Sequence, residues 1–242
     1  AHEVLERFAR SDIAHATREE SIREMLDAAL DALARERYGK QPLPAVIVQI
    51  EQMRRRLWAF AHWQAAWARD GWEIRHSEAS VRQLVGDCAL EVDGRSMNVR
   101  GRIDRIDFNP QTGQWFLFDY KTGDRGREPD EAHRSSAGAW IDLQLPLYRH
   151  FVAPRLGASP RVGYITLPRS IREVKPRLAN WTDADFESAI EQARAVVRSI
   201  WAERFWPPAS IPPAFSEPFA AICHDHQFGA AVAAAAEGEE SA

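Results

Sequence analysis

The sequence predicts an α/β fold in which a helical N-terminal part precedes a core of strands and helices. Residues 1–72 carry apolar side chains at helical spacing, which indicates the helical part. Residues 73–204 begin with alternating and aromatic-rich segments typical of strands, and a helical segment and another strand-like segment follow. With the helix before them, these segments predict a core in the order α-β-β-β-α-β.

Three helices are expected in the N-terminal part, over residues 1–10, 18–37 and 46–69. Gly39 and the prolines that follow it end the second helix. In the third helix Trp63 and Trp67 lie four residues apart, with Phe60 beside them. An aromatic stripe at this spacing more often packs in a core than stacks on nucleic-acid bases.

Five strands and two more helices are expected in the core, residues 73–204. Strands are expected at residues 74–86, 88–93, 97–108, 115–121 and 161–167, and helices at 138–152 and 183–204. Pro146 falls inside the first of these helices and marks either a first turn or a kink. The segment Asn109–Gln114 has turn chemistry and joins two strands into a hairpin.

This hairpin carries the most informative residues of the chain. If Phe108 pairs with Trp115, counting outward places Asp104 opposite Asp119. Directly opposed side chains on an antiparallel pair lie roughly 5 Å apart. Two facing carboxylates repel each other, so such a pair needs a shared proton or a bound cation.

Lys121 adds a third functional group to the hairpin. Because side chains alternate along a strand, Asp119 and Lys121 share a face while Tyr120 points away. Hard divalent ions such as Mg²⁺ accept oxygen ligands, lower the pKa of a bound water and offset charge on a phosphate. Asp104, Asp119 and Lys121 therefore point to phosphodiester hydrolysis. The alternative from these residues alone is a surface hairpin with solvated charges, and both interpretations stay open at this point.

The composition is that of an ordinary globular protein. The 242 residues, 45% hydrophobic and 27% charged, suffice for one sizeable domain. No apolar run approaches the length of a membrane span, and no secretory signal is seen. The two cysteines, Cys88 and Cys223, fit a reducing compartment, so a cytoplasmic location is expected. No P-loop signature occurs, which excludes an ATPase of that kind in this sequence.

The net charge of −4 does not indicate nucleic-acid binding, so clusters of basic residues matter more than the sum. One cluster, interrupted only by Glu173, comprises Arg161, Arg169, Arg172, Lys175 and Arg177. A second, in the glycine-containing segment 123–130, holds Arg125 and Arg127. Contacts to DNA phosphates are expected from Arg125, Arg127, Arg169 and Arg172. The alternative for both clusters is a solvated surface loop.

Three motifs stand in order along the chain: Gly101-x-x-Asp104-Arg105-x-Asp107, Asp119-Tyr120-Lys121-Thr122-Gly123 and Gln144-Leu145-Pro146-Leu147-Tyr148. Together they resemble the RecB-like branch of the PD-(D/E)XK nuclease superfamily, which includes the nuclease domains of the RecBCD and AddAB helicase–nucleases. The first residues, Ala1 to Phe8, are similar to the family's opening helix. The resemblance covers about residues 1 to 150. It implies the family's restriction-endonuclease-like core, a central mixed sheet flanked by helices.

The resemblance also implies a metal site. His2, Asp104 and Asp119 would bind Mg²⁺ or Mn²⁺, the Tyr120 carbonyl would complete the shell, and Lys121 would be the catalytic lysine. These roles follow from matching positions in the family's motifs.

Further residues match the family less directly. Gln144 and Tyr148 match its Q-x-x-x-Y element and share a helix face, which lets them reach the site together; the alternative is an ordinary amphipathic helix. Glu78 lies where the family often has another acidic residue, and it is expected as a further metal ligand or else as a solvated strand start. Arg105, inside the first motif, is expected to contact DNA.

The implied activity is that of a metal-dependent DNA nuclease, an exonuclease acting on single-stranded DNA. The chain would be the C-terminal part of an AddB-like DNA repair or recombination protein with a helicase partner, at work on the bacterial nucleoid. The alternative is a nuclease fold kept without catalysis for DNA binding or helicase docking, although the catalytic positions are intact. A small-molecule metallohydrolase would need more histidine ligands than His2 alone.

The chain departs from the family pattern at its two ends. Many relatives hold an iron–sulfur cluster with four cysteines; two cysteines cannot, so no cluster is expected. No metal is expected at Cys223-His224-Asp225-His226 either. The glycine ahead of the opening helix is absent, as in a fragment cut from a longer polypeptide. One domain is expected over residues 1–229, ending in a proline-rich segment at 205–229, with a disordered tail at 230–242.

Overall fold

The structure is a computed structural model, and it describes residues 1–204. Residues 1–195 form one compact unit, and a second unit begins at Val196. Within the described residues, no helix is long and apolar enough to cross a membrane. The segment 205–229, the tail 230–242 and the run from Cys223 to His226 lie outside them. The expectations for these parts, and the single domain that includes them, therefore stay predictions.

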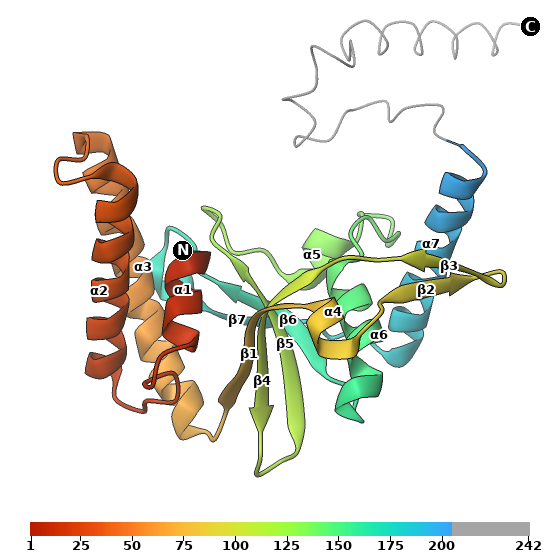
Figure 1. The fold of residues 1–242 in the computed structure, drawn as a ribbon, viewed down its shortest axis with the longest axis horizontal. Coiled ribbons are helices and arrows are strands. Elements are labelled where there is room, and N and C mark those ends of the chain that lie inside the picture. Colours follow the sequence, from red (N-terminus) through yellow and green to blue (C-terminus); the bar gives the residue numbers. More distant parts are fainter. Residues whose placement is uncertain (205–242) are drawn as a thin grey trace, which may run out of the picture. The chain divides into compact units, whose positions relative to one another are not determined.

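The N-terminal part consists of the three expected helices, α1 (His2–Ala9), α2 (Glu19–Tyr38) and α3 (Pro44–Arg69) (Figure 1). Gly39 ends α2 with a φ of 73°, a left-handed conformation that glycine adopts without steric cost. Pro44 occupies the first turn of α3, where its missing N–H leaves no helical hydrogen bond unmade.

The core is a five-stranded sheet in the order β1-β4-β5-β6-β7. Its strands are β1 (Glu73–Ser80), β4 (Arg102–Asn109), β5 (Gln114–Lys121), β6 (Arg161–Thr166) and β7 (Lys175–Leu178). β5 and β6 run parallel, and the other neighbours are antiparallel. The parallel pair is joined through the short helix α5 (Pro129–His133) and α6 (Gln144–Leu156), and α7 (Asp183–Trp201) follows β7. The α/β fold with a central mixed sheet flanked by helices is confirmed.

The strand expected at 74–86 is too long. It ends at Ser80, and a short helix, α4 (Val81–Val85), follows. Ser80 and Gln83 form a capping box, in which the Gln83 N–H donates to Ser80 Oγ and the Ser80 N–H donates to Gln83 Oε1. The Ser-x-x-Gln spacing was the signal for this helix start.

Other boundaries differ where short elements intervene. The strand expected at 97–108 is divided: β3 (Arg95–Asn98) pairs with β2 (Ala89–Val92) in a separate two-stranded sheet, and β4 begins at Arg102. The helix expected from residue 138 begins at Gln144, which places Pro146 in its first turn. α5, β7 and the 3₁₀ turn η1 (Ile171–Glu173) were not predicted.

The sheet separates two hydrophobic cores. Phe116, Phe118 and Tyr120 of β5 pack with α1, α2 and α3 on one face. Leu117, between them in sequence, packs on the opposite face with Leu145 of α6. The aromatic stripe on α3 belongs to the first core, as expected: Trp67, for example, makes edge contacts with Phe116 and Phe118. The alternation therefore assigns Asp119 and Lys121 to the face that α6 covers.

Arg105 and Asp107 form a buried ion pair between β4 and α3. Both are 0% exposed, and Arg105 Nε and Nη2 lie 2.7 and 2.6 Å from the two Asp107 oxygens. Arg105 Nη1 donates to Gln64 Oε1 (2.7 Å), and Trp67 Nε1 donates to Asp107 Oδ2 (2.7 Å). The prediction that Arg105 contacts DNA is therefore wrong. Residues two apart on a strand share a face, and this face is covered by α3.

Candidate active site

The central hairpin brings Asp104 to Asp119. β4 and β5 pair with Phe108 opposite Trp115, which is the pairing that the sequence argument assumed. Continued by one residue beyond the last paired position, this register places Asp104, near the start of β4, opposite Asp119. The strands part there, and the Tyr120 N–H donates to Asp104 Oδ2 (2.7 Å). A carboxylate thus takes the place that a strand carbonyl would occupy.

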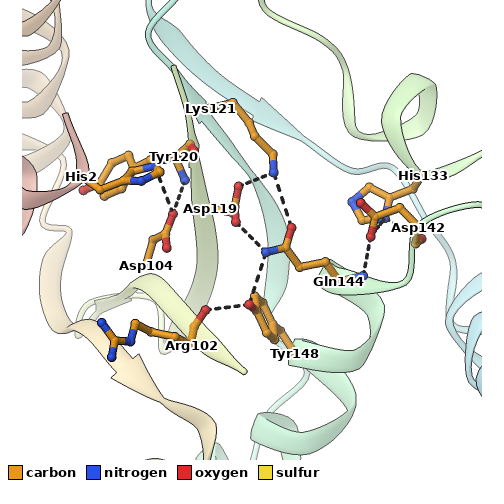
Figure 2. Close-up of polar contacts among 10 residues, drawn as sticks. All are labelled: His2, Arg102, Asp104, Asp119, Tyr120, Lys121, His133, Asp142, Gln144 and Tyr148. Carbon is orange, nitrogen blue, oxygen red and sulfur yellow. Dashed lines mark hydrogen bonds and ion pairs between the residues drawn. The ribbon is translucent and has the colours of Figure 1, made fainter. Parts of the chain in front are cut away.

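Gln144 connects the two charged groups that follow on β5. Its Nε2 donates to Asp119 Oδ1 (2.9 Å), and its Oε1 lies 3.4 Å from Lys121 Nζ (Figure 2). Lys121 Nζ is also 2.8 Å from Asp119 Oδ2. Tyr148, one helical turn along α6, donates from its hydroxyl to the Arg102 carbonyl (2.6 Å) and accepts from Gln144 Nε2 (3.3 Å). α6 therefore carries both Gln144 and Tyr148 to the carboxylates.

His2 approaches from the other side of the hairpin. Its Nε2 lies 3.0 Å from the Tyr120 carbonyl oxygen and 3.8 Å from Asp104 Oδ2 (Figure 2). α1 holds it there, because Val4 and Leu5 of this helix are fully buried in the first core. His2, Asp104 and the Tyr120 carbonyl, three of the expected metal ligands, thus meet at one point.

Glu78 lies on the neighbouring strand β1, where the register places it opposite Asp104. Its backbone has a φ of 50°, which is unusual and strained for a residue other than glycine. The side chain lines a pocket together with His2, and Arg102 Nη1 lies 3.7 Å from Glu78 Oε2. Glu78 is therefore close enough to supply a further carboxylate at the His2 side of the site.

The environment makes Asp104 costly to ionise. Burial, followed by the nearby Asp119 carboxylate, raises the pKa of Asp104 to about 6; the Tyr120 N–H and His2 act in the opposite direction. Asp119, 5% exposed, has the Lys121 ammonium beside it. The pair thus holds like charges that a cation placed between them would stabilise.

The donors at this site match a hard divalent cation. Carboxylate oxygens, a backbone carbonyl and an imidazole are ligands that Mg²⁺ or Mn²⁺ accepts. Asp119 Oδ2 has the Lys121 ion pair but no hydrogen bond of normal geometry. Within residues 1–204, no three His, Cys, Asp or Glu side chains are gathered closely enough to hold a metal by themselves. The donor chemistry fits the ion, while Asp119 is engaged with Gln144 and Lys121 rather than with the His2 cluster.

Sequence reasoning missed three residues around this site. Asp142 Oδ1 accepts from the Gln144 N–H (2.8 Å), and the Asp142 carbonyl accepts from the buried His133 Nδ1 (2.7 Å). Tyr164 of β6 is paired with Asp119 in the sheet, and Lys121 Nζ lies 4.9 Å from the centre of its ring. An aspartate just ahead of a helix is a capping signal, so Asp142 was recognisable; His133 and Tyr164 had no local signal.

The four remaining arginines expected to contact phosphates are all exposed. Arg125 and Arg127 lie in the loop that follows β5, and Arg169 and Arg172 follow β6. All four therefore belong to the edge of the sheet at which Lys121 ends β5.

Comparison with known families gives the class of protein. A family model described as the PD-(D/E)XK nuclease superfamily matches residues 1–224. Because the match covers most of the chain, the chain belongs to this superfamily. Among curated proteins, no relative matches. The paired carboxylates and the lysine of the central hairpin thus occur in a chain that belongs to a nuclease superfamily.

Asp104→Asn is expected to stabilise the metal-free protein by about 1–3 kcal/mol at pH 7, because it removes the cost of burying a charged carboxylate and its repulsion by Asp119, while its amide oxygen still accepts from the Tyr120 N–H. The pKa of Asp104, about 6, lies above its ordinary value of 3.8. The cost of ionising the buried Asp104 beside Asp119 is therefore fully present above pH 6 and fades as the pH falls toward 3.8. The gain should shrink on acidification.

Urea denaturation in EDTA at neutral and acidic pH measures this gain. Asp87→Asn, at an aspartate whose side chain is 91% exposed, serves as the control and should change stability little. A variant less stable than the wild type at pH 7, or a gain that does not vary with pH, would contradict the electrostatic account of Asp104.

Proposed function

We propose that this chain is a deoxyribonuclease domain that depends on Mg²⁺ or Mn²⁺. The observation that carries this proposal is the placement of Asp104, Asp119 and Lys121 at the end of one hairpin, with Gln144 linking the last two. Two acidic groups and a cation at one point provide the charges that phosphodiester hydrolysis requires.

His2, Asp104, Asp119 and the Tyr120 carbonyl would hold the metal ion, with Glu78 as a further acidic ligand. When bound, the ion supplies a water of lowered pKa and offsets the negative charge on the phosphate. Such an ion would stabilise the ionised form of Asp104, whose pKa is raised by burial and by the Asp119 charge.

The chain's own residues orient the reacting groups. Lys121 Nζ presents a positive charge beside Asp119, where it can position the attacking water or stabilise charge that develops on the phosphate. Gln144 contacts Asp119 with its amide nitrogen and Lys121 with its amide oxygen, so it fixes both relative to each other. Tyr148 supports Gln144 and is itself fixed by the Arg102 carbonyl.

The motif resemblance supports a finer proposal. The chain would be the RecB-like nuclease domain of a larger, AddB-like DNA repair or recombination protein, acting as an exonuclease on a single strand fed by a helicase partner. It would then work on the nucleoid in the cytoplasm. The contacts among Lys121, Asp119 and Gln144 favour an active domain over a nuclease fold kept only for binding.

Linear and circular single-stranded DNA, each with a duplex of the same sequence, test this function in the presence of Mg²⁺ or Mn²⁺. We expect degradation of linear single strands from an end, while circles stay intact. Cleavage of circles would overturn the exonuclease assignment and leave the nuclease assignment in place. Tight DNA binding without cleavage of any substrate would favour the non-catalytic alternative.

A further inference from the structure

The loops that follow β5 and β6 are joined next to Lys121. The Leu167 N–H donates to the Lys121 carbonyl (2.8 Å), and the Arg169 N–H donates to the Asp124 carbonyl (3.1 Å). These bonds continue the parallel pairing of β5 and β6 beyond the ends of both strands. The two loops thus form one connected surface at the edge where Lys121 lies.

Arg56 of α3 fastens both loops from the core side. It is 7% exposed, and its Nη1 donates to the Thr122 carbonyl (3.1 Å) and to the Leu167 carbonyl (3.3 Å). Its Nη2 lies 3.5 Å from Asp124 Oδ1. One guanidinium therefore ties the first residues of both loops to the helical part.

Arg177 of β7 fastens the first loop at its far end. It pairs with Glu128, and its Nη2 lies 3.7 Å from a Glu173 oxygen. Its guanidinium lies against Gly126, where an added Cβ would come within 2.7 Å of Nη2. A side chain at this position would therefore have to displace the guanidinium. Arg177, part of the basic cluster seen in sequence, has these carboxylate partners and is less available to phosphates.

The other arginines of the two loops face solvent without such partners. Arg125, Arg127, Arg169 and Arg172 are exposed, and none of them forms an ion pair with the part of the chain that the structure describes. The two loops, joined to each other next to Lys121, thus present four exposed guanidinium groups. The planar guanidinium of arginine can donate two parallel hydrogen bonds to one phosphate, and such contacts do not depend on the base sequence of the DNA.

The opposite flank of the carboxylate pair differs in charge. A pocket of about 520 Å³ beside His2 is lined by Glu3, Glu6 and Glu78 together with Arg37. The arginines of that flank already have carboxylate partners: Arg7 and Arg37 pair with Glu3, and Arg10 pairs with Glu6. Unbalanced positive charge therefore lies on the β5–β6 loop flank of the site.

We propose that Arg125, Arg127, Arg169 and Arg172 bind the phosphates of a DNA strand on one side of the scissile bond. The bound DNA strand would then lie on the Lys121 side of the carboxylate pair. The metal and the released product would lie on the His2 side. This inference rests on the proposed nuclease function and adds the path of the substrate. Because the contacts are to phosphates, binding is independent of base sequence.

Fluorescence anisotropy of a labelled thymidine oligonucleotide in EDTA, over a series of salt concentrations, tests this path. The variants are Arg125→Ala/Arg127→Ala and Arg169→Ala/Arg172→Ala. Each double variant should reduce the slope of log Kd against log salt concentration by about 1.4, since each phosphate contact to a single strand contributes about 0.7. An oligonucleotide of mixed sequence should give the same slopes.

Two further variants serve as controls. Arg155→Ala removes an exposed arginine at the far end of α6, roughly 16 Å along the helix from Gln144, and should leave the slope unchanged. Arg177→Gln keeps all four phosphate-binding arginines but releases their brace, so it should weaken binding severalfold at an unchanged slope. Thermal unfolding of each variant confirms that the fold is kept.

Unchanged slopes in both double variants, or an equal loss of slope in Arg155→Ala, would overturn the proposed path. Unchanged affinity in Arg177→Gln would overturn the role of the brace. Metal-dependent cleavage by the wild type, measured in parallel, separates this inference from the function on which it rests. If cleavage is present and the slopes do not change, the path fails and the nuclease assignment stands; if the wild type neither binds nor cleaves DNA, both fail.

Discussion

Lys121→Ala is expected to lower the cleavage rate at saturating DNA and Mg²⁺ by about 10²–10³-fold, with a much smaller effect on DNA affinity. Lys121 Nζ is the cation beside Asp119, and Gln144 Oε1 holds it from the α6 side. Removing it takes away a charge placed for the reaction, whereas at most one of several phosphate contacts is lost. Single-turnover cleavage of labelled DNA and anisotropy measure the two effects separately.

Lys40→Ala is the matched control for this variant. Lys40 is exposed in the connection between α2 and α3, so its removal changes the net charge equally without touching the hairpin. We expect its rate to equal that of the wild type. A Lys121→Ala enzyme that cleaves DNA within a factor of a few of the control would show that the catalytic group lies elsewhere.

Asp107→Asn is expected to destabilise the fold by about 3–5 kcal/mol, because it leaves the fully buried Arg105 guanidinium without its counter-charge. The substitution preserves the shape of the side chain, so the loss reports charge rather than packing. Urea denaturation in EDTA measures it. Asp104→Asn, three residues earlier on the same strand, should act in the opposite direction, because Asp104 is near a like charge and Asp107 is paired with an opposite one.

A double variant tests the cause of this loss. Arg105→Met combined with Asp107→Leu removes both charges and should recover a large part of the stability lost in Asp107→Asn, since neither partner is left uncompensated. Asp107→Asn costing less than about 1 kcal/mol would contradict the view that the pair is a tightly coupled buried unit.

The central hairpin was predictable from sequence because its signals are local. A turn segment between two runs with strand propensity suggests that Phe108 pairs with Trp115, and from that pairing counting places Asp104 opposite Asp119. The same alternation assigns Asp119 and Lys121 to the face opposite Tyr120. The register of this one hairpin was thus enough to predict that Asp104 and Asp119 lie opposite each other.

Elements stabilised by distant partners were not predictable in this way. β7 is a four-residue edge strand that contains Pro176, and it has no apolar alternation to mark it. Its pairing with β6 is visible only in the fold, and so is the role of Arg177 as a brace for the loop after β5. The basic cluster seen in sequence therefore mixes a structural arginine with exposed ones.

The orientation of the Arg105 side chain is a second feature that was not predicted from the sequence. In the sequence it stands inside a nuclease motif and next to Asp104, which made a DNA contact a reasonable expectation. In the fold it points to the other face of the sheet, where α3 supplies Gln64 and Trp67 to complete a buried polar network with Asp107. Only the position of α3, a tertiary feature, decides which neighbour on the strand reaches solvent.

Cleavage of end-labelled single-stranded DNA by the wild type and by Asp119→Ala, with Mg²⁺, with Mn²⁺ and with EDTA, tests the central claim most directly. We expect cleavage by the wild type with either metal, none in EDTA, and none by a folded Asp119→Ala protein under any condition. Cleavage by Asp119→Ala at the rate of the wild type, or wild-type cleavage that persists in EDTA, would contradict a metal-dependent site built on Asp104, Asp119 and Lys121.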